Sequence, residues 1–193
     1  FDIIVHPKPI VTFQTTNHCP YEDISFSANN EYNVPMSMFN WDFDQDDNLS
    51  NEPSPSYNFG LSGNYDVELI AIDSNSCADT VIQTVIVQPA PIADIVAQDP
   101  CELSPLQITD NSTIADTFTI LYYSWEYGDN TVALNPSEEK YYETFGDYNI
   151  QLVLTASNGC MDTIVESITV HANPVINYHI DPVCQNTWTA FED

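Results

Sequence analysis

Four carboxylates lie within six residues at the end of a predicted strand, and they form the clearest chemical signal in the sequence. The members of this cluster are Asp42, Asp44, Asp46 and Asp47. Calcium prefers hard oxygen ligands held in a loop, so we expect calcium binding by Asp44, Asp46 and Asp47. The competing interpretation is structural, because the stretch lacks the glycine and the distal glutamate of an EF-hand loop and Asp42 is typical of a turn-capping residue. The sequence suggests no other cofactor.

Catalytic residues are not evident. The four histidines stand near predicted strand ends without a matching nucleophile; they are His6, His18, His171 and His179. The sequence contains no Gly-x-Ser-x-Gly, His-Glu-x-x-His or phosphate-loop pattern. We therefore predict that the chain is not an enzyme.

The carboxylate cluster belongs to a repeat. Placing Trp41 on Trp125 aligns further cysteine, glycine, tyrosine and proline residues at a period of 82 to 84 residues. Repetition of this kind indicates tandem structural units. We expect the last strand of a preceding unit at 1–8, whole units at 9–90 and 91–173, and the start of a following unit at 174–193.

Five cysteines follow the same register. Each whole unit has one cysteine near its start and another about 58 residues later, so the simplest pairing is Cys19 with Cys77 and Cys101 with Cys160. Cys184 then pairs with a cysteine beyond residue 193. Disulfides in every unit predict an oxidising, extracellular location.

The charge of the chain is strongly negative. Twenty-nine acidic residues against two lysines give a formal net charge of −27. Such a surface repels phosphates and anionic lipids, so we expect neither nucleic-acid binding nor membrane insertion by this segment.

Alternation of apolar and polar residues with period two predicts strands throughout both units. The expected strands are 10–15, 22–28, 36–43, 55–59, 64–73 and 79–87 in the first unit, and 92–97, 105–110, 118–127, 138–144, 147–157 and 162–170 in the second. Six or seven short strands per unit predict an all-β fold of tandem antiparallel sandwiches. Short linkers that contain proline, such as 88–91, predict a linear rod.

The motifs resemble those of the PKD (polycystic kidney disease) domain, which implies immunoglobulin-like sandwiches. The hallmark Trp-Asp-Phe-Gly-Asp turn corresponds to Trp41-Asp42-Phe43-Asp44 and to Trp125-Glu126-Tyr127-Gly128-Asp129. Gly63-Asn64-Tyr65 and Gly146-Asp147-Tyr148 match the Gly-x-Tyr motif, and Gly159-Cys160-Met161-Asp162-Thr163 matches a Gly-Cys-x-Asp-Thr motif of bacterial copies. The resemblance covers the whole chain.

Acidic, cysteine-stapled arrays of this type resemble the giant cell-surface adhesins of gliding Bacteroidetes, which are exported by the type IX route. This resemblance implies a non-catalytic stalk segment of a gliding-motility adhesin, whose partners are neighbouring repeats of the same chain. It also implies O-glycosylation of Thr80 and Thr163, each within an Asp-Thr-aliphatic sequon. The competing interpretation of these threonines is that they simply suit the last strand of each unit.

The alternative function is an accessory or spacer module of a secreted hydrolase that binds a surface polysaccharide or protein. Such binding needs exposed aromatic side chains. Most aromatic residues here alternate toward the predicted core, so the candidates are Tyr21, Tyr32 and Tyr122.

Overall fold

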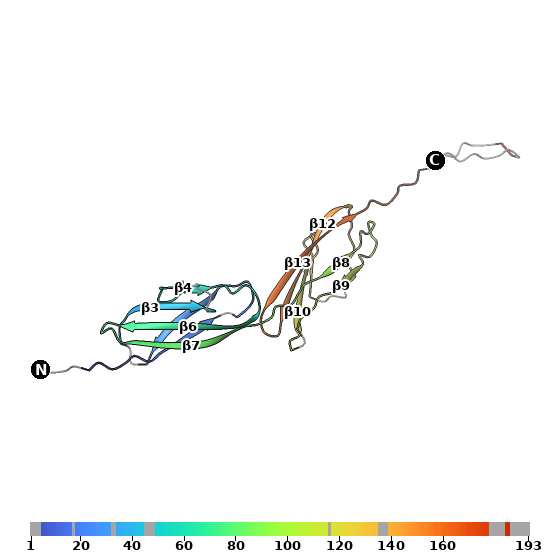
Figure 1. The fold of residues 1–193 in the computed structure, drawn as a ribbon. Helices are drawn as coiled ribbons and strands as arrows, with labels where there is room; N and C mark the ends of the chain where they lie inside the picture. Colours follow the sequence, from blue (N-terminus) through green and yellow to red (C-terminus); the bar gives the residue numbers. More distant parts are fainter. Residues whose placement is uncertain are drawn as a thin grey trace.

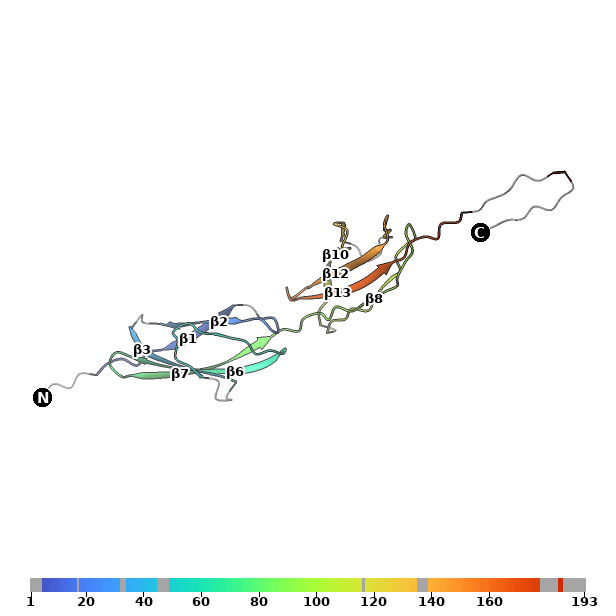
Figure 2. The same ribbon diagram turned by 90° about the horizontal axis from the view of Figure 1, so that it is seen from above.

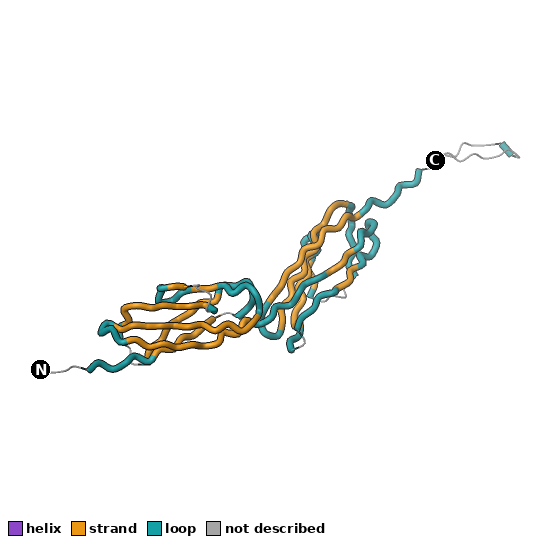
Figure 3. The backbone as a smooth tube through the Cα atoms, in the orientation of Figure 1, coloured by secondary structure: helices purple, strands orange, loops and turns teal. Residues whose placement is uncertain are grey.

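A computed structural model describes residues 5–16, 18–31, 34–44, 49–115, 117–134, 139–177 and 184–185. Two β-sandwiches follow one another along an elongated molecule, joined by a short segment around residues 88–91 (Figure 1, Figure 2). Every regular element of the described residues is a strand, as Figure 3 shows by colour. None of these residues belongs to a helix long and apolar enough to cross a bilayer.

The first sandwich places a three-stranded sheet against a four-stranded sheet. The smaller sheet has the order β1-β2-β5 and consists of β1 (Val11–Thr16), β2 (Ile24–Asn30) and β5 (Ser56–Tyr57). The larger sheet has the order β4-β3-β6-β7 and consists of β3 (Met36–Phe43), β4 (Leu49–Ser50), β6 (Gly63–Asp73) and β7 (Ala78–Val87). All strand pairs are antiparallel.

The second sandwich repeats this plan with shorter strands in its small sheet. The large sheet, in the order β11-β10-β12-β13, contains β10 (Ile120–Glu126), β11 (Val132–Ala133), β12 (Gly146–Ala156) and β13 (Met161–Val170). Facing it are β8 (Ile95–Ala97) and β9 (Ile108–Asp110). The strand expected at 138–144 does not form over its described part, where a single bridge joins Pro105 to Tyr141.

Alternation along the long strands builds one core in each sandwich. Val67, Leu69 and Ala71 are fully buried on β6, and Ile150, Leu152 and Leu154 are fully buried on β12. Trp41 and Trp125 pack into these cores with exposures of 0% and 1%. The predicted all-β class, the inward face of these strands and the core position of the tryptophans are confirmed.

A tyrosine corner marks each sandwich as immunoglobulin-like. The hydroxyl of Tyr65 donates to the carbonyl of Leu61 at 2.9 Å, and the hydroxyl of Tyr148 donates to the carbonyl of Thr144 at 3.0 Å. Both bonds reach four residues back, so the tyrosine of each Gly-x-Tyr motif fixes the turn that enters the longest strand.

The two flanking segments lie outside both sandwiches. Residues 5–8 are exposed and belong to no strand, while residues 1–4 are outside the described part of the chain. A strand at 1–8 would pair within another unit, so this expectation stays a prediction. Residues 174–177 are likewise exposed and belong to no strand.

Candidate functional site at the junction of the sandwiches

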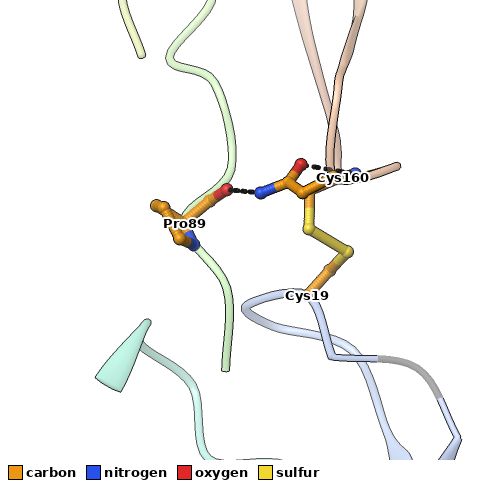
Figure 4. Close-up of a disulfide and its surroundings, with 4 residues drawn as sticks. Cys19, Pro89 and Cys160 are labelled. Atoms are coloured by element: carbon orange, nitrogen blue, oxygen red, sulfur yellow. Dashed lines mark hydrogen bonds between the residues drawn. A yellow bond between two sulfur atoms is a disulfide. The ribbon is translucent and has the colours of Figure 1, made fainter. Parts of the chain in front are cut away.

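A disulfide joins the two sandwiches. Cys19 lies in the loop between β1 and β2, and Cys160 lies in the hairpin between β12 and β13. Their Cα atoms are 5.5 Å apart although 141 positions separate them in the sequence (Figure 4). The bond therefore closes a covalent loop that includes most of both sandwiches.

This bond corrects the predicted pairing of Cys19 with Cys77 and of Cys101 with Cys160. Within a sandwich, the two cysteines lie at opposite ends. The carbonyl of His18 accepts the amide of Gln88 at 2.6 Å, and Gln88 follows Cys77 by eleven residues along β7, or about 36 Å of strand. A disulfide requires Cα atoms within about 7 Å, so the two cysteines of one folded unit cannot meet.

Strand order explains the opposite ends. The chain crosses the first sandwich once in β1 before it reaches Cys19, so Cys19 lies at the end from which the chain leaves. Cys77 precedes the last crossing, β7, and therefore lies at the end where the chain enters. The cysteine at the exit of one unit thus meets the hairpin cysteine of the next, and the prediction that Cys184 pairs beyond residue 193 stays a prediction.

Polar contacts hold the hairpin of the second sandwich against the linker. The side-chain amide (Nδ2) of Asn158 donates to the carbonyl of Pro89 at 2.7 Å (Figure 4). The amide of Ala93 donates to the Asp162 carboxylate at 2.8 Å, which ties the start of the second sandwich to the strand after the hairpin. The contact between Asn158 and Pro89 restricts the angle at which the second sandwich leaves the linker.

A cleft of about 550 Å³ lies between the two sandwiches beside the linker. Pro20, Tyr21 and Leu61 line it from the first sandwich, and Ile114 and Met161 line it from the second. Its apolar walls and its position resemble those of a ligand site, since such sites often occur at domain interfaces.

The three candidate aromatic residues have different surroundings. Tyr21 lines the junction cleft and is 73% exposed, whereas Tyr122 is 69% exposed on β10. Tyr32 lies outside the described residues. Tyr122 is not among the residues that line this cleft.

The structure describes only part of the predicted calcium site. Asp46 and Asp47 lie outside the described residues. Asp44 adopts a positive φ of 68°, and its amide donates to the carbonyl of Asp66 at 3.1 Å. One carboxylate oxygen of Asp42 is buried without a hydrogen-bond partner among the described residues. No group of three or more His, Cys, Asp or Glu side chains suited to a metal was found in that part of the chain, and calcium binding stays a prediction.

In the second sandwich, a lysine side chain binds the turn that corresponds to the Asp44 turn of the first. The Lys140 ammonium donates to the Asp129 carboxylate and, at 2.7 Å, to the hydroxyl of Thr131. It also lies 5.4 Å from the ring centroid of Tyr127 and 5.0 Å from that of Tyr142, within cation–π range. Sequence reasoning missed this cluster; the signal was that Lys140 is one of only two cations in the chain.

The electrostatics of this cluster follow from burial and charge. Burial acts to raise the pKa of Asp129, but hydrogen bonds from Lys140 and Thr131 outweigh it and hold that pKa below its usual range. Burial, followed by the negative charge of Asp129, raises the pKa of the Tyr142 phenol. The cluster is therefore an ion pair with neutral aromatic walls at neutral pH.

The two predicted glycosylation threonines are exposed on the last strand of each sandwich. Thr80 lies on β7 and Thr163 on β13. The aspartate before each threonine binds the start of its sandwich: Asp79 accepts the amide of Val11 on β1 at 3.0 Å, and Asp162 accepts that of Ala93, just before β8. This contact gives the Asp-Thr pair a structural role, and glycosylation stays a prediction.

The sequence matches one known family of protein domains twice. A model described as the PKD domain matches residues 6–87 and again residues 88–171. The chain belongs to the PKD domain family. PKD domains are typically non-catalytic modules, and PKD domains together with a disulfide indicate an extracellular setting.

Several solved structures resemble the chain. The PKD1 domain of the Vibrio cholerae metalloprotease PrtV is 23% identical, with a TM-score of 0.39, over 42% of this chain and 98% of that domain. The PKD1 domain of Vibrio anguillarum Epp is 19% identical, with a TM-score of 0.40, over 44% and 96%. Fibronectin(III)-like modules of Clostridium thermocellum CbhA are 15% identical, with a TM-score of 0.38, over 88% and 100%. No curated protein matches the sequence.

Proposed function

We propose that this chain is a non-catalytic stalk segment of a large cell-surface adhesin of gliding motility, exported by the type IX route. The observation that carries the proposal is the junction: two PKD domains are joined end to end by a short linker and by the Cys19–Cys160 bond. A segment built in this way holds whatever follows it at a distance from whatever precedes it.

The surface of the segment supports a spacing role. The formal charge of −27 favours solubility and repels neighbouring copies, as a crowded surface layer requires. The junction contacts limit changes in the mutual orientation of the two domains.

Labelling of intact cells tests this proposal. An antibody raised against residues 6–171 should bind cells that produce the full-length protein without permeabilisation, and the label should move along the surface of gliding cells. Label that appears only after permeabilisation would contradict a surface role. Surface label on cells that neither glide nor adhere would contradict the adhesin.

The junction cleft favours a second candidate, a module that binds a polysaccharide or protein surface as an accessory to a secreted hydrolase. Tyr21 presents an exposed ring at that cleft. Saturable binding of a soluble polysaccharide that is lost in Tyr21→Ala but retained in Tyr122→Ala would support this candidate. Absence of saturable binding across a glycan panel would favour the spacer.

A further inference from the structure

Each half of the junction bond recurs at an outer end of the two-domain segment. Cys77 occupies in the first domain the hairpin position of Cys160, and Cys101 occupies in the second domain the loop position of Cys19. Neither Cys77 nor Cys101 forms a disulfide within the described residues. Cys101 is exposed and Cys77 is half-buried, whereas the bonded Cys160 is 1% exposed.

The two hairpins have the same backbone geometry. The carbonyl of Cys77 accepts the amide of Asp73 at 2.9 Å, and the carbonyl of Cys160 accepts the amide of Ala156 at the same distance. The residue before each cysteine has a positive φ, 64° at Ser76 and 87° at Gly159. The first domain therefore presents Cys77 as the second domain presents Cys160.

The two loops also match. The carbonyl before each loop cysteine accepts an amide that follows the last strand: Gln88 donates to His18 at 2.6 Å, and His171 donates to Pro100 at 2.8 Å. Two residues after the cysteine, Tyr21 and Leu103 have φ values of 59° and 58°. The second domain therefore presents Cys101 as the first presents Cys19.

The linker position is repeated as well. A cleft of about 510 Å³ at the entry end of the first domain is lined by Pro7, Lys8, Pro9, Ile10 and Asp79. These residues correspond in the repeat to Pro89, Ala90, Pro91, Ile92 and Asp162, which line the junction cleft. The entry end thus has the half of the junction that a preceding PKD domain would complete.

We propose that Cys101 forms a disulfide with the hairpin cysteine of a PKD domain that follows, and that Cys77 forms one with the loop cysteine of a PKD domain that precedes. Each bond links a domain to its neighbour rather than to itself, so successive covalent loops overlap along the array. Formation of each bond removes two protons and two electrons from the thiol pair. The oxidant is a disulfide donor such as oxidised glutathione, which is reduced to two thiols.

A chain that carries residues 6–170 twice in succession tests this proposal with units already shown to have their own cores. Joining Val170 to a second His6 keeps the natural linker spacing, because His6, Gln88 and His171 are equivalent positions. After oxidation with a glutathione buffer, peptide mapping should find Cys101 of the first copy bonded to Cys77 of the second. Only Cys77 of the first copy and Cys101 of the second should then react with an alkylating reagent.

Two matched variants exclude a chance pairing. Cys77→Ser in the second copy should leave Cys101 of the first copy open to alkylation, while Cys77→Ser in the first copy should change no bond. Full alkylation of both central cysteines after oxidation, with the Cys19–Cys160 bonds intact, would overturn the proposal. Pairing of Cys101 with any cysteine other than Cys77 of the second copy would also overturn it.

Discussion

Lys140 is the residue on which the turn region of the second PKD domain depends. Its side chain is only 12% exposed and satisfies Asp129, Thr131 and two aromatic faces. We expect Lys140→Met to lower the free energy of unfolding of the second domain by about 1–3 kcal/mol, because the Asp129 carboxylate loses its charged partner. Urea denaturation followed by circular dichroism measures this change.

Lys8 provides the matched control for that substitution. It pairs with Asp79 at 2.6 Å, but its side chain is 67% exposed, so Lys8→Met should cost at most about 1 kcal/mol. Equal losses in the two variants would show that the enclosure of Lys140 contributes nothing.

The same ion pair predicts a pH dependence. The folded-state pKa of Asp129 lies below its unfolded value, so its stabilising effect is complete above about pH 4 and is lost as the pH falls through the folded-state value. Acid also relieves the repulsion among the other carboxylates. The stability difference between the natural chain and Lys140→Met isolates the pair, and this difference should shrink as the pH falls below about 4. A difference that stays constant over this range would contradict the assignment.

The turns that follow β10 and β12 each contain a glycine with a positive φ. Gly128 has a φ of +75°, and an added Cβ would lie 2.8 Å from the carbonyl oxygen of Asn149 on β12. Gly159 has a φ of +87°, but its Cβ would meet nothing within 4 Å. An alanine at position 128 would therefore meet both backbone strain and a steric clash. An alanine at position 159 would meet backbone strain only.

These two positions give a paired prediction. Gly159→Ala should cost about 1–2 kcal/mol from backbone strain alone. Gly128→Ala should cost about 3 kcal/mol or more, because β12 must also move. Both substitutions act on the second domain, so one series of denaturation curves compares them directly. A smaller loss for Gly128→Ala than for Gly159→Ala would contradict the close approach to Asn149.

The long strands were the part of the fold that sequence reasoning predicted best. Alternation over ten or more residues placed β6, β7, β12 and β13 within one residue at each end, because one face of each strand packs on a core. The two-residue strands β4 and β11 escaped prediction, since a period cannot be recognised in two positions. The expected strand at 138–144 failed because its alternating residues serve the Lys140 cluster and a single bridge instead.

The disulfide pairing was wrong for a topological reason. Sequence spacing shows one early and one late cysteine in each unit, and the simplest pairing joins them within the unit. Each strand carries the chain from one end of the sandwich to the other, and the two cysteines are separated by the whole length of β7. Counting strand crossings in the sequence would have assigned Cys19 and Cys77 to opposite ends.

For the whole molecule, the junction predicts a reversible loss of alignment on reduction. The Cys19–Cys160 bond and the Asn158–Pro89 hydrogen bond both connect the second domain to the exit end of the first. Small-angle scattering of Cys19→Ser/Cys160→Ser should therefore show a broader range of interdomain angles. The circular dichroism spectrum should not change, because each domain keeps its own core. Identical scattering curves would show that the linker and the Asn158–Pro89 hydrogen bond set the angle without the disulfide.

The overlapping covalent loops have a mechanical consequence. An unbonded PKD unit of about 83 residues can be drawn out to roughly 280 Å. If the proposed bonds are present, tension would pass through one disulfide and then along only the 24 residues from Cys77 to Cys101 before it reaches the next disulfide. Most of each domain would lie outside this path. The residues on this path extend to about 80 Å per two units, close to the roughly 75 Å that two eleven-residue strands span end to end. Such a tether would be almost inextensible, and would transmit a load along its length instead of absorbing it by unfolding.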